Sequence, residues 1–284
     1  MSNLVSYLFE TNALRICPDN KPFWYTSGKI GPYYINTHFL YGSEQNALDL
    51  LGFIDSEKSD KITLPKKVFE KTISHYNENE IYKNVIDEML KFIQENINVS
   101  EIDYISGGER RDWFFSNIIA NKLNKPHITI YKDLTLIIND SNFELEIAKE
   151  SVKGAKVLHI ADLITEASSY IRAWIPAIKN LEAKILWSTV VVDRMQGGKE
   201  KLENENVKSL SIINIDTNLF EKAFSMNIIN QTQFEMLKNF YENPDETMRN
   251  FLIAHPEFLE NALASDEKTA SRAKLCIDSN LYNL

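Results

Sequence analysis

Residues 157–169 read Val-Leu-His-Ile-Ala-Asp-Leu-Ile-Thr-Glu-Ala-Ser-Ser, and this stretch decides the fold. Its apolar first half predicts a buried β-strand, and its hydroxyl-rich second half predicts a turn that enters a helix from about residue 166 to 181. Ligands of open α/β sheets bind where such a strand meets such a turn. Amides at the start of a helix, together with nearby hydroxyls, can hold a phosphate. The candidate residues are Asp162, which can accept hydrogen bonds from sugar hydroxyls, and Thr165, Glu166, Ala167, Ser168 and Ser169.

The same composition also fits a plain strand–helix connection. Ser, Thr and Asp are common there because their side chains cap helices. In that interpretation Thr165 caps the helix, Asp162 supports the turn, and no ligand is involved. Composition alone favours this second interpretation, so the rest of the chain has to distinguish the two.

The flanking sequence predicts an α/β fold. Short apolar strands are expected at residues 102–106, 127–131, 185–192 and 207–215, with a helix at 112–123. This alternation is typical of a parallel sheet covered by helices. Residues 134–138 and 143–147 flank an Asn-Asp-Ser-Asn turn, which predicts a β-hairpin.

The two ends of the chain differ from this centre. Residues 23–42 are rich in aromatic residues and glycine and predict β-structure with turns, whereas helical spacing predicts helices at 44–60 and 65–97. From residue 216 the strands stop, and three capping signals predict helices. The expected organisation is a sheet domain at 1–215, with a small hood at about 1–42, and an all-helical extension at 216–284.

Composition narrows the class of function. The net charge of −9 argues against a general nucleic-acid binder, although a few arginines can still form a local anion site. Two distant cysteines and the absence of a leader pattern predict a reduced, cytoplasmic protein, and no apolar run is long enough to span a membrane. The histidines show no metal-ligand spacing, so no metal site built by the protein alone is expected.

Residues 106–113 read Ser-Gly-Gly-Glu-Arg-Arg-Asp-Trp, a glycine-rich turn between a strand and a helix. Two adjacent arginines at such a turn suit a pyrophosphate group, because guanidinium groups bind phosphate oxygens in pairs. The alternative is an exposed turn whose arginines, Arg110 and Arg111, pair with Glu109 and Asp112.

Several separate segments and their order along the chain resemble the orotate phosphoribosyltransferase family of type I phosphoribosyltransferases. Residues 157–169 resemble the family loop that binds phosphoribosyl pyrophosphate (PRPP), with Ala161 in place of the first acid and Ala167 in place of glycine. Residues 23–36 resemble the pyrimidine-site motif, with Thr26 and Gly31 as departures. The remaining matches are Arg111 in the pyrophosphate loop, Lys132 after the next strand, and Arg194 in Asp-Arg-Met-Gln-Gly-Gly.

The resemblance implies a function and a site. It implies a type I phosphoribosyltransferase sheet and transfer of the 5-phosphoribosyl group from PRPP to orotate or a related base, with pyrophosphate released, as in pyrimidine biosynthesis. It also implies Mg²⁺ carried by PRPP, a homodimer, and small-molecule substrates. Catalysis is assigned to Asp162 and Lys132, PRPP binding to these two with Arg110, Arg111 and residues 165–169, and base binding to Ser27, Lys29, Tyr33, Tyr34 and Arg194.

One segment leaves an alternative open. Residues 133–150 stand where the family has a flexible loop rich in lysine and glycine, yet they contain no glycine and only Lys149. A hairpin there fits either a rebuilt lid or a non-catalytic protein that binds PRPP or a nucleotide.

Overall fold

The computed structural model describes residues 2–18 and 21–284, which form two compact units. Unit 1 contains residues 2–11 and 37–215, and unit 2 contains residues 12–18, 21–36 and 216–284. A boundary between the units falls at residue 215, and most of residues 1–42 belongs to the same compact unit as the C-terminal helices. The hood and the extension are thus one unit rather than two separate additions to the sheet.

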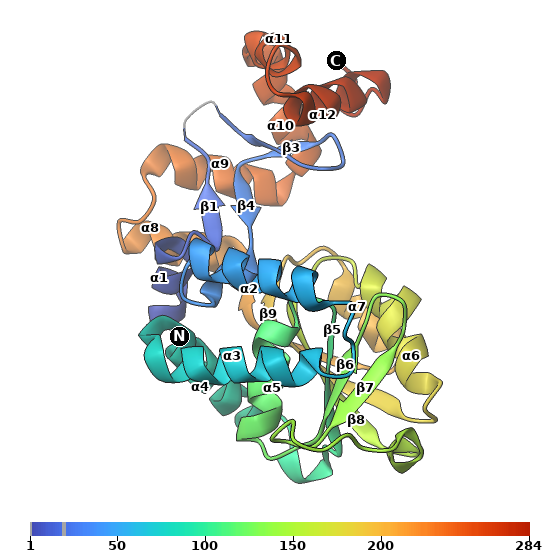
Figure 1. The fold of residues 1–284 in the computed structure, drawn as a ribbon. Helices are drawn as coiled ribbons and strands as arrows, with labels where there is room; N and C mark the ends of the chain where they lie inside the picture. The colour runs from blue at the N-terminus through green and yellow to red at the C-terminus, as the bar shows by residue number, and fades with distance from the viewer. Residues whose placement is uncertain (1, 19–20) are drawn as a thin grey trace. The chain divides into compact units, whose positions relative to one another are not determined.

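Unit 1 is built on a six-stranded sheet with the order β10-β9-β8-β5-β6-β7 (Figure 1). Neighbouring strands are parallel except for the edge strand β7, which is antiparallel to β6. The predicted α/β fold with a parallel sheet flanked by helices is therefore confirmed. The strands are β5 (Tyr104–Gly108), β6 (His127–Ile130), β7 (Leu136–Asn139), β8 (Lys156–Ile164), β9 (Lys184–Asp193) and β10 (Lys208–Asn214).

Helices cover both faces of this sheet. The chain passes through α5 from β5 toward one edge, and through α6 and α7 from β8 toward the other edge. Because crossovers between parallel strands are right-handed, connections that run in opposite directions lie on opposite faces. The helical segments of unit 1 are α1 (Ser2–Glu10), η1 (Thr37–Leu40), α2 (Glu44–Glu57), α3 (Leu64–Glu78), α4 (Glu80–Asn96), η2 (Val99–Glu101), α5 (Trp113–Lys122), η3 (Lys149–Val152), η4 (Tyr170–Trp174), α6 (Ile175–Lys179) and α7 (Gly198–Asn204).

Two expected elements of unit 1 differ in detail. The long helix expected at 65–97 is two helices, because Asn79 ends α3 and its side chain accepts a hydrogen bond from the Tyr82 amide at the start of α4. The hairpin expected within 134–147 forms only as a short one: β7 pairs with β6, and an antiparallel bridge joins Asn139 to Glu146. Two backbone hydrogen bonds flank this bridge, from the Asp140 amide to the Leu145 carbonyl at 2.9 Å and from the Ile147 amide to the Ile138 carbonyl at 2.7 Å. Phe143, in the turn between the two halves, is buried and stacks on Phe69 of α3.

Unit 2 combines two small antiparallel sheets with five helices. β1 (Leu14–Ile16) pairs with β4 (Tyr33–Ile35), and β2 (Phe23–Trp24) pairs with β3 (Ile30–Gly31). The three expected helix starts are confirmed, at Asp216, Pro244 and Asp266, and two further helices lie between them. The helices are α8 (Thr217–Ser225), α9 (Gln231–Glu242), α10 (Pro244–Ala254), α11 (Glu257–Leu263) and α12 (Glu267–Asp278).

Aromatic contacts join the strands of unit 2 to its helices. The Tyr33 ring lies 6.2 Å from that of Phe220 and 5.9 Å from that of Phe240, and Trp24 stacks on Phe258 at 5.6 Å. These pairs bury large apolar rings of residues 21–36 against the helices, which accounts for the grouping of the two segments in one unit.

None of the helices in the described ranges, 2–18 and 21–284, is both long enough and apolar enough to cross a membrane.

The buried hydroxyl of Tyr282 gives a test of unit 2. It accepts a hydrogen bond from the Ile30 amide at 2.8 Å. Tyr282→Phe leaves that buried amide without its acceptor, so it should lower the free energy of unfolding by about 1–3 kcal/mol. Urea unfolding measures the change, and Tyr241→Phe, at a partly exposed ring, serves as the control. Equal stability of the two variants would contradict the role given to this bond.

A candidate phosphate-binding site

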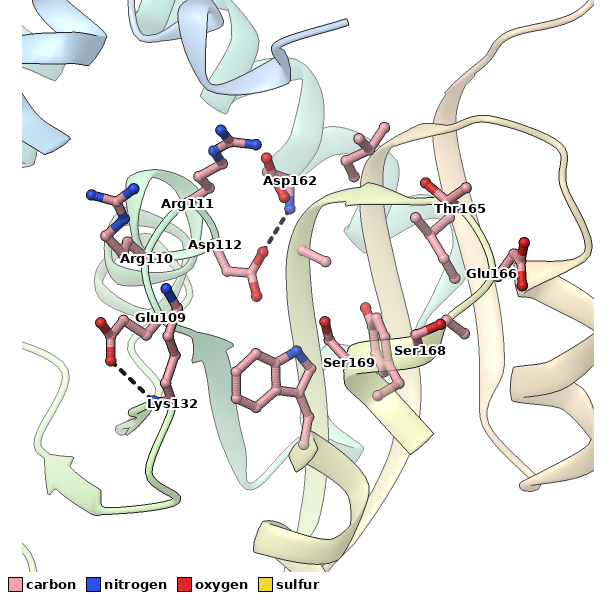
Figure 2. A pocket seen from close by; sticks show the side chains of 16 residues that line it. Glu109, Arg110, Arg111, Asp112, Lys132, Asp162, Thr165, Glu166, Ser168 and Ser169 are labelled. Carbon is pink, nitrogen blue, oxygen red and sulfur yellow. Dashed lines mark hydrogen bonds between the residues drawn. The ribbon is translucent and has the colours of Figure 1, made fainter. Parts of the chain in front are cut away.

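A pocket of about 620 Å³ opens in unit 1 at the carboxyl ends of β5, β6 and β8 (Figure 2). It gathers side chains from three loops and the start of one helix. The lining residues are Glu109, Arg110, Arg111, Asp112, Lys132, Ala161, Asp162, Leu163, Ile164, Thr165, Glu166, Ala167, Ser168, Ser169, Tyr170 and Trp174.

The pocket exists because two neighbouring strands separate. β5 and β8 are paired from Tyr104–Val157 to Ser106–His159. Beyond that point Gly107 and Gly108 pair only with β6, and the rest of β8 pairs only with β9. The connections leave β5 and β8 in opposite directions, so this is the switch point where ligands of open α/β sheets bind.

The loop after β8 has the form expected of an anion-binding turn. Ala167 has a left-handed backbone with φ of +55°, and helical structure begins at Ser168. Within the described chain, no hydrogen bond from the backbone amides of residues 166–169 is present. Ser168 and Ser169 are exposed at the pocket, so amides and hydroxyls are presented together to a ligand.

Glycine allows a neighbouring turn to support this loop. A Cβ on Gly198 would lie 2.7 Å from the Thr165 carbonyl oxygen, so only glycine allows the two backbones to approach this closely. The Arg194 amide donates to the Ile164 carbonyl at 3.0 Å. The interpretation of Thr165 as a helix cap is wrong, because helical structure begins three residues later, at Ser168, and no side-chain hydrogen bond caps this start.

The pyrophosphate-type turn of residues 106–113 lies on the opposite side of the pocket (Figure 2). Glu109 accepts a hydrogen bond from the Lys132 amide at 2.9 Å, which fixes the start of the segment after β6. Arg110 pairs with Asp55 of α2. The expected alternative, in which the arginines pair with Glu109 and Asp112, is therefore not what forms.

Two carboxyl groups lie between these loops. Asp162 is 8% exposed, and Asp112, from the start of α5, accepts its backbone amide at 3.0 Å. Burial and the Asp112 charge raise the pKa of Asp162 to about 8, against the opposing effect of Arg111. Burial and the neighbouring carboxylate thus both favour the protonated form of this carboxyl.

The structure brings all the predicted PRPP residues into this one pocket. The sequence interpretation missed Asp112 as a site residue, along with Tyr170 and Trp174. The sequence does show an acid, Asp112, beside two arginines, but this pattern indicates a possible ion pair and not a bond to the sheet. The indole of Trp174 packs on Gly108, where any Cβ would collide with it, and nothing in the sequence pattern indicated that contact.

The predicted base-binding residues are divided between the units. Arg194 follows β9 in unit 1, whereas Ser27, Lys29, Tyr33 and Tyr34 belong to unit 2. There, Lys29 pairs with Asp245 at 2.7 Å and Tyr33 is part of the aromatic core. Burial in this core does not support a base-binding role for Tyr33, whereas the Lys29 pair is at the surface and the role of Lys29 stays a prediction.

No group of three or more His, Cys, Asp or Glu side chains that could hold a metal ion occurs among the described residues.

Several known proteins are similar to this chain in sequence. No protein-family model matches the chain. An orotate phosphoribosyltransferase of Sulfolobus acidocaldarius is 22% identical over 218 residues, covering 77% of this chain and 87% of the relative. An adenine phosphoribosyltransferase of Lachnoclostridium phytofermentans is 29% identical over 155 residues, covering 50% of this chain and 86% of the relative.

Solved structures show the same arrangement. The crystal structure of orotate phosphoribosyltransferase from Francisella tularensis superposes with a TM-score of 0.55 at 14% identity, covering 84% of this chain and 98% of that one. The enzyme structure from Aeropyrum pernix gives a TM-score of 0.50 at 17% identity, covering 78% and 99%. The chain therefore has the fold of the type I phosphoribosyltransferases. In sequence it is similar both to an orotate phosphoribosyltransferase and to adenine phosphoribosyltransferases.

The raised pKa of Asp162 predicts a pH-dependent contribution to stability. A carboxyl whose pKa is higher in the folded than in the unfolded chain stabilises the fold fully below about pH 4, and the stabilisation is lost as the pH rises to about 8. The stability of the wild type minus that of Asp162→Asn should therefore fall over this window, by up to about 1.4 kcal/mol per pH unit.

Urea unfolding of both proteins at several pH values measures this difference. Asp49→Asn, which changes an exposed acid on α2, is the matched control and should give a difference that stays flat. A flat difference for Asp162→Asn as well would contradict the raised pKa.

Proposed function

We propose that the chain transfers the 5-phosphoribosyl group of PRPP to a nitrogen of orotate or a related base and releases pyrophosphate. One observation carries the proposal: two anion-binding loops face each other across one pocket, with a carboxyl group between them (Figure 2). PRPP has the matching form, because its ribose lies between a 5-phosphate and a pyrophosphate. The related orotate and adenine phosphoribosyltransferases support the same reaction class.

Each loop has a distinct task in this proposal. The amides and hydroxyls of residues 165–169 bind the 5-phosphate, and Asp162 accepts hydrogen bonds from the ribose hydroxyls. Arg110, Arg111 and Lys132 bind the pyrophosphate, whose negative charge grows as its bond to the anomeric carbon breaks. Fixed cations aimed at that charge stabilise the transition state, which is the main electrostatic contribution available here.

Mg²⁺ arriving with PRPP fits the donors present. This ion binds to one or two protein carboxylates and otherwise to phosphate oxygens and water. Asp162 lines the pocket and would face it, and the ion would supply additional neutralisation of the pyrophosphate charge. The predicted homodimer and cytoplasmic location are further parts of the proposal.

Arg110 has to leave Asp55 before it can bind pyrophosphate. Its side chain is 25% exposed and that of Asp55 is 46% exposed, so the pair is solvated and weak. Exchange of this partner for a doubly charged phosphate is therefore favourable.

One observation favours a second candidate, a protein that binds PRPP without turning it over. The segment at 133–150, where the family has a flexible loop, makes side-chain contacts with α3. Phe143 stacks on Phe69 at 4.7 Å, and Lys66 pairs with Glu144 at 2.7 Å. Binding and turnover must therefore be measured separately.

The first test measures both. PRPP binding is followed by calorimetry, and pyrophosphate release is assayed with a panel of bases. Thr165→Val keeps the shape of the side chain but removes its hydroxyl, so PRPP affinity should fall by about 1–2 kcal/mol. Thr247→Val, on α10 of unit 2, is the control. Binding without release would select the second candidate, and no PRPP binding by the wild type at millimolar concentration would end both.

The second test concerns the base. If Arg194 pairs with a substrate carboxylate, Arg194→Ala should weaken orotate binding by about 2–5 kcal/mol, because a bidentate charged pair is lost. Uracil lacks the carboxylate, so its affinity should change far less. Calorimetry with both bases in the presence of pyrophosphate measures the contrast, and equal losses would rule out the carboxylate assignment.

A further inference from the structure

The Asp112 carboxylate occupies the gap between the two separating strands. Its Oδ2 accepts the Gly108 amide at 2.9 Å, and its Oδ1 accepts the Asp162 amide at 3.0 Å. Gly108 ends β5, immediately before the loop with the two arginines, and Asp162 lies three residues before Thr165. A single side chain therefore connects the strand ends that carry the two anion-binding loops.

These two bonds replace hydrogen bonds that the sheet has lost. The β5–β8 ladder stops at Ser106 and His159, so the amides beyond it have no partner on the neighbouring strand. Buried amides without acceptors are costly, by about 1–3 kcal/mol each. The carboxylate accepts a hydrogen bond from one amide on each side of the gap and so sets the distance between the two strands there.

The side chain of Asp112 bonds to the two strands and does not cap the helix that starts after it. It is the N-cap residue of α5, where an aspartate commonly accepts an amide of its own helix. Here its side chain makes no such bond and turns toward the sheet instead. His159 of β8 lies next to Asp112, with its Nε2 3.5 Å from Oδ2 of Asp112. The other ring nitrogen of His159, Nδ1, is hydrogen-bonded to the Ser106 hydroxyl at 2.9 Å. The contacts of Asp112 therefore serve the strand gap rather than the helix.

We propose that Asp112 is a positioning residue that sets the spacing between the two anion-binding loops, so that a ligand with phosphate groups at both ends can bind both loops at once. The ligand in this inference comes from the proposed function. Binding at two sites by one molecule gains affinity only when the geometry lets both ends engage together. A change in spacing should therefore weaken a two-ended ligand far more than a one-ended ligand.

The experiment compares three ligands by calorimetry: PRPP, ribose 5-phosphate and inorganic pyrophosphate. Asp112→Asn keeps the size of the side chain, but its amide nitrogen cannot accept a hydrogen bond, so one strand end is released. PRPP affinity should fall by about tenfold or more, whereas affinity for each one-ended ligand should change by less than about threefold. A change of charge in the pocket acts on all three anions in the same direction, so electrostatics alone does not predict a loss confined to PRPP.

A matched control separates positioning from loss of stability. Asp193 is also a buried carboxylate at a strand end, and it accepts the Met195 amide at 2.7 Å. Asp193→Asn should lower the free energy of unfolding in urea, yet leave the ratio of PRPP to ribose 5-phosphate affinity unchanged. Where Asp112→Asn does not fold, Asp112→Glu serves the same comparison, because it keeps both acceptors and displaces them by one methylene.

The outcomes separate this inference from the proposed function. Equal losses for all three ligands, or a gain for PRPP, would overturn the positioning role while PRPP binding by the wild type stands. Failure of the wild type to bind PRPP would instead remove the proposed function.

Discussion

The separation of two parallel strands is the constraint on which the rest of unit 1 depends. β5 and β8 pair for only three residue pairs before their chains turn toward opposite edges of the sheet. The gap between them creates a concave site, but it also leaves backbone amides without partners in a buried place. The Asp112 carboxylate resolves this conflict by bonding to both strand ends. The negative charge of Asp112 is also one cause of the raised pKa of Asp162. The residue that bridges the strands therefore also affects the ionisation of a carboxyl in the pocket.

The phosphate loop shows how a departure from a family pattern can leave a geometry intact. Ala167 stands where the family has glycine, and it nevertheless has the left-handed backbone that glycine adopts without strain. For alanine this conformation costs roughly 1–2 kcal/mol. Its methyl group is buried with the core residues under the loop, which offsets part of that cost. Function-related strain of this kind persists only where the surroundings fix the backbone, as Gly198 and the Ile164–Arg194 bond do here.

Much of the fold and of the pocket could be predicted because the signals are local. The apolar strand at 157–164, the hydroxyl-rich turn after it and the paired arginines all lie within short stretches, and strand alternation then brings them to one sheet edge. The turn of the hairpin at 134–147 follows its local signal, but the pairing is short, and a long-range contact of Phe143 with Phe69 attaches the turn to α3. The use of Asp112 could not be predicted from local sequence, which offers it only as an ion-pair partner of the neighbouring arginines, because the strand gap that its carboxylate occupies is a tertiary feature. The start of α9 did carry a local signal, since Asn230 and Gln233 form a capping box.

The N-terminal motif shows why a sequence resemblance does not by itself transfer a residue's role. Aromatic and glycine residues suit a base-binding surface, but the same residues suit the interior of a small helical unit. In this chain the second use is visible at two positions: Trp24 stacks on Phe258, and Tyr33 packs on Phe220 and Phe240. The helices after residue 216 therefore bury Tyr33, which the resemblance assigns to the base site. By contrast, the residues predicted to bind PRPP line one pocket, because the sheet edge that gathers them is a property of the fold. The pocket therefore supports the proposed phosphate-binding role. The N-terminal motif does not support the choice of base in the same way, because part of it is buried in unit 2.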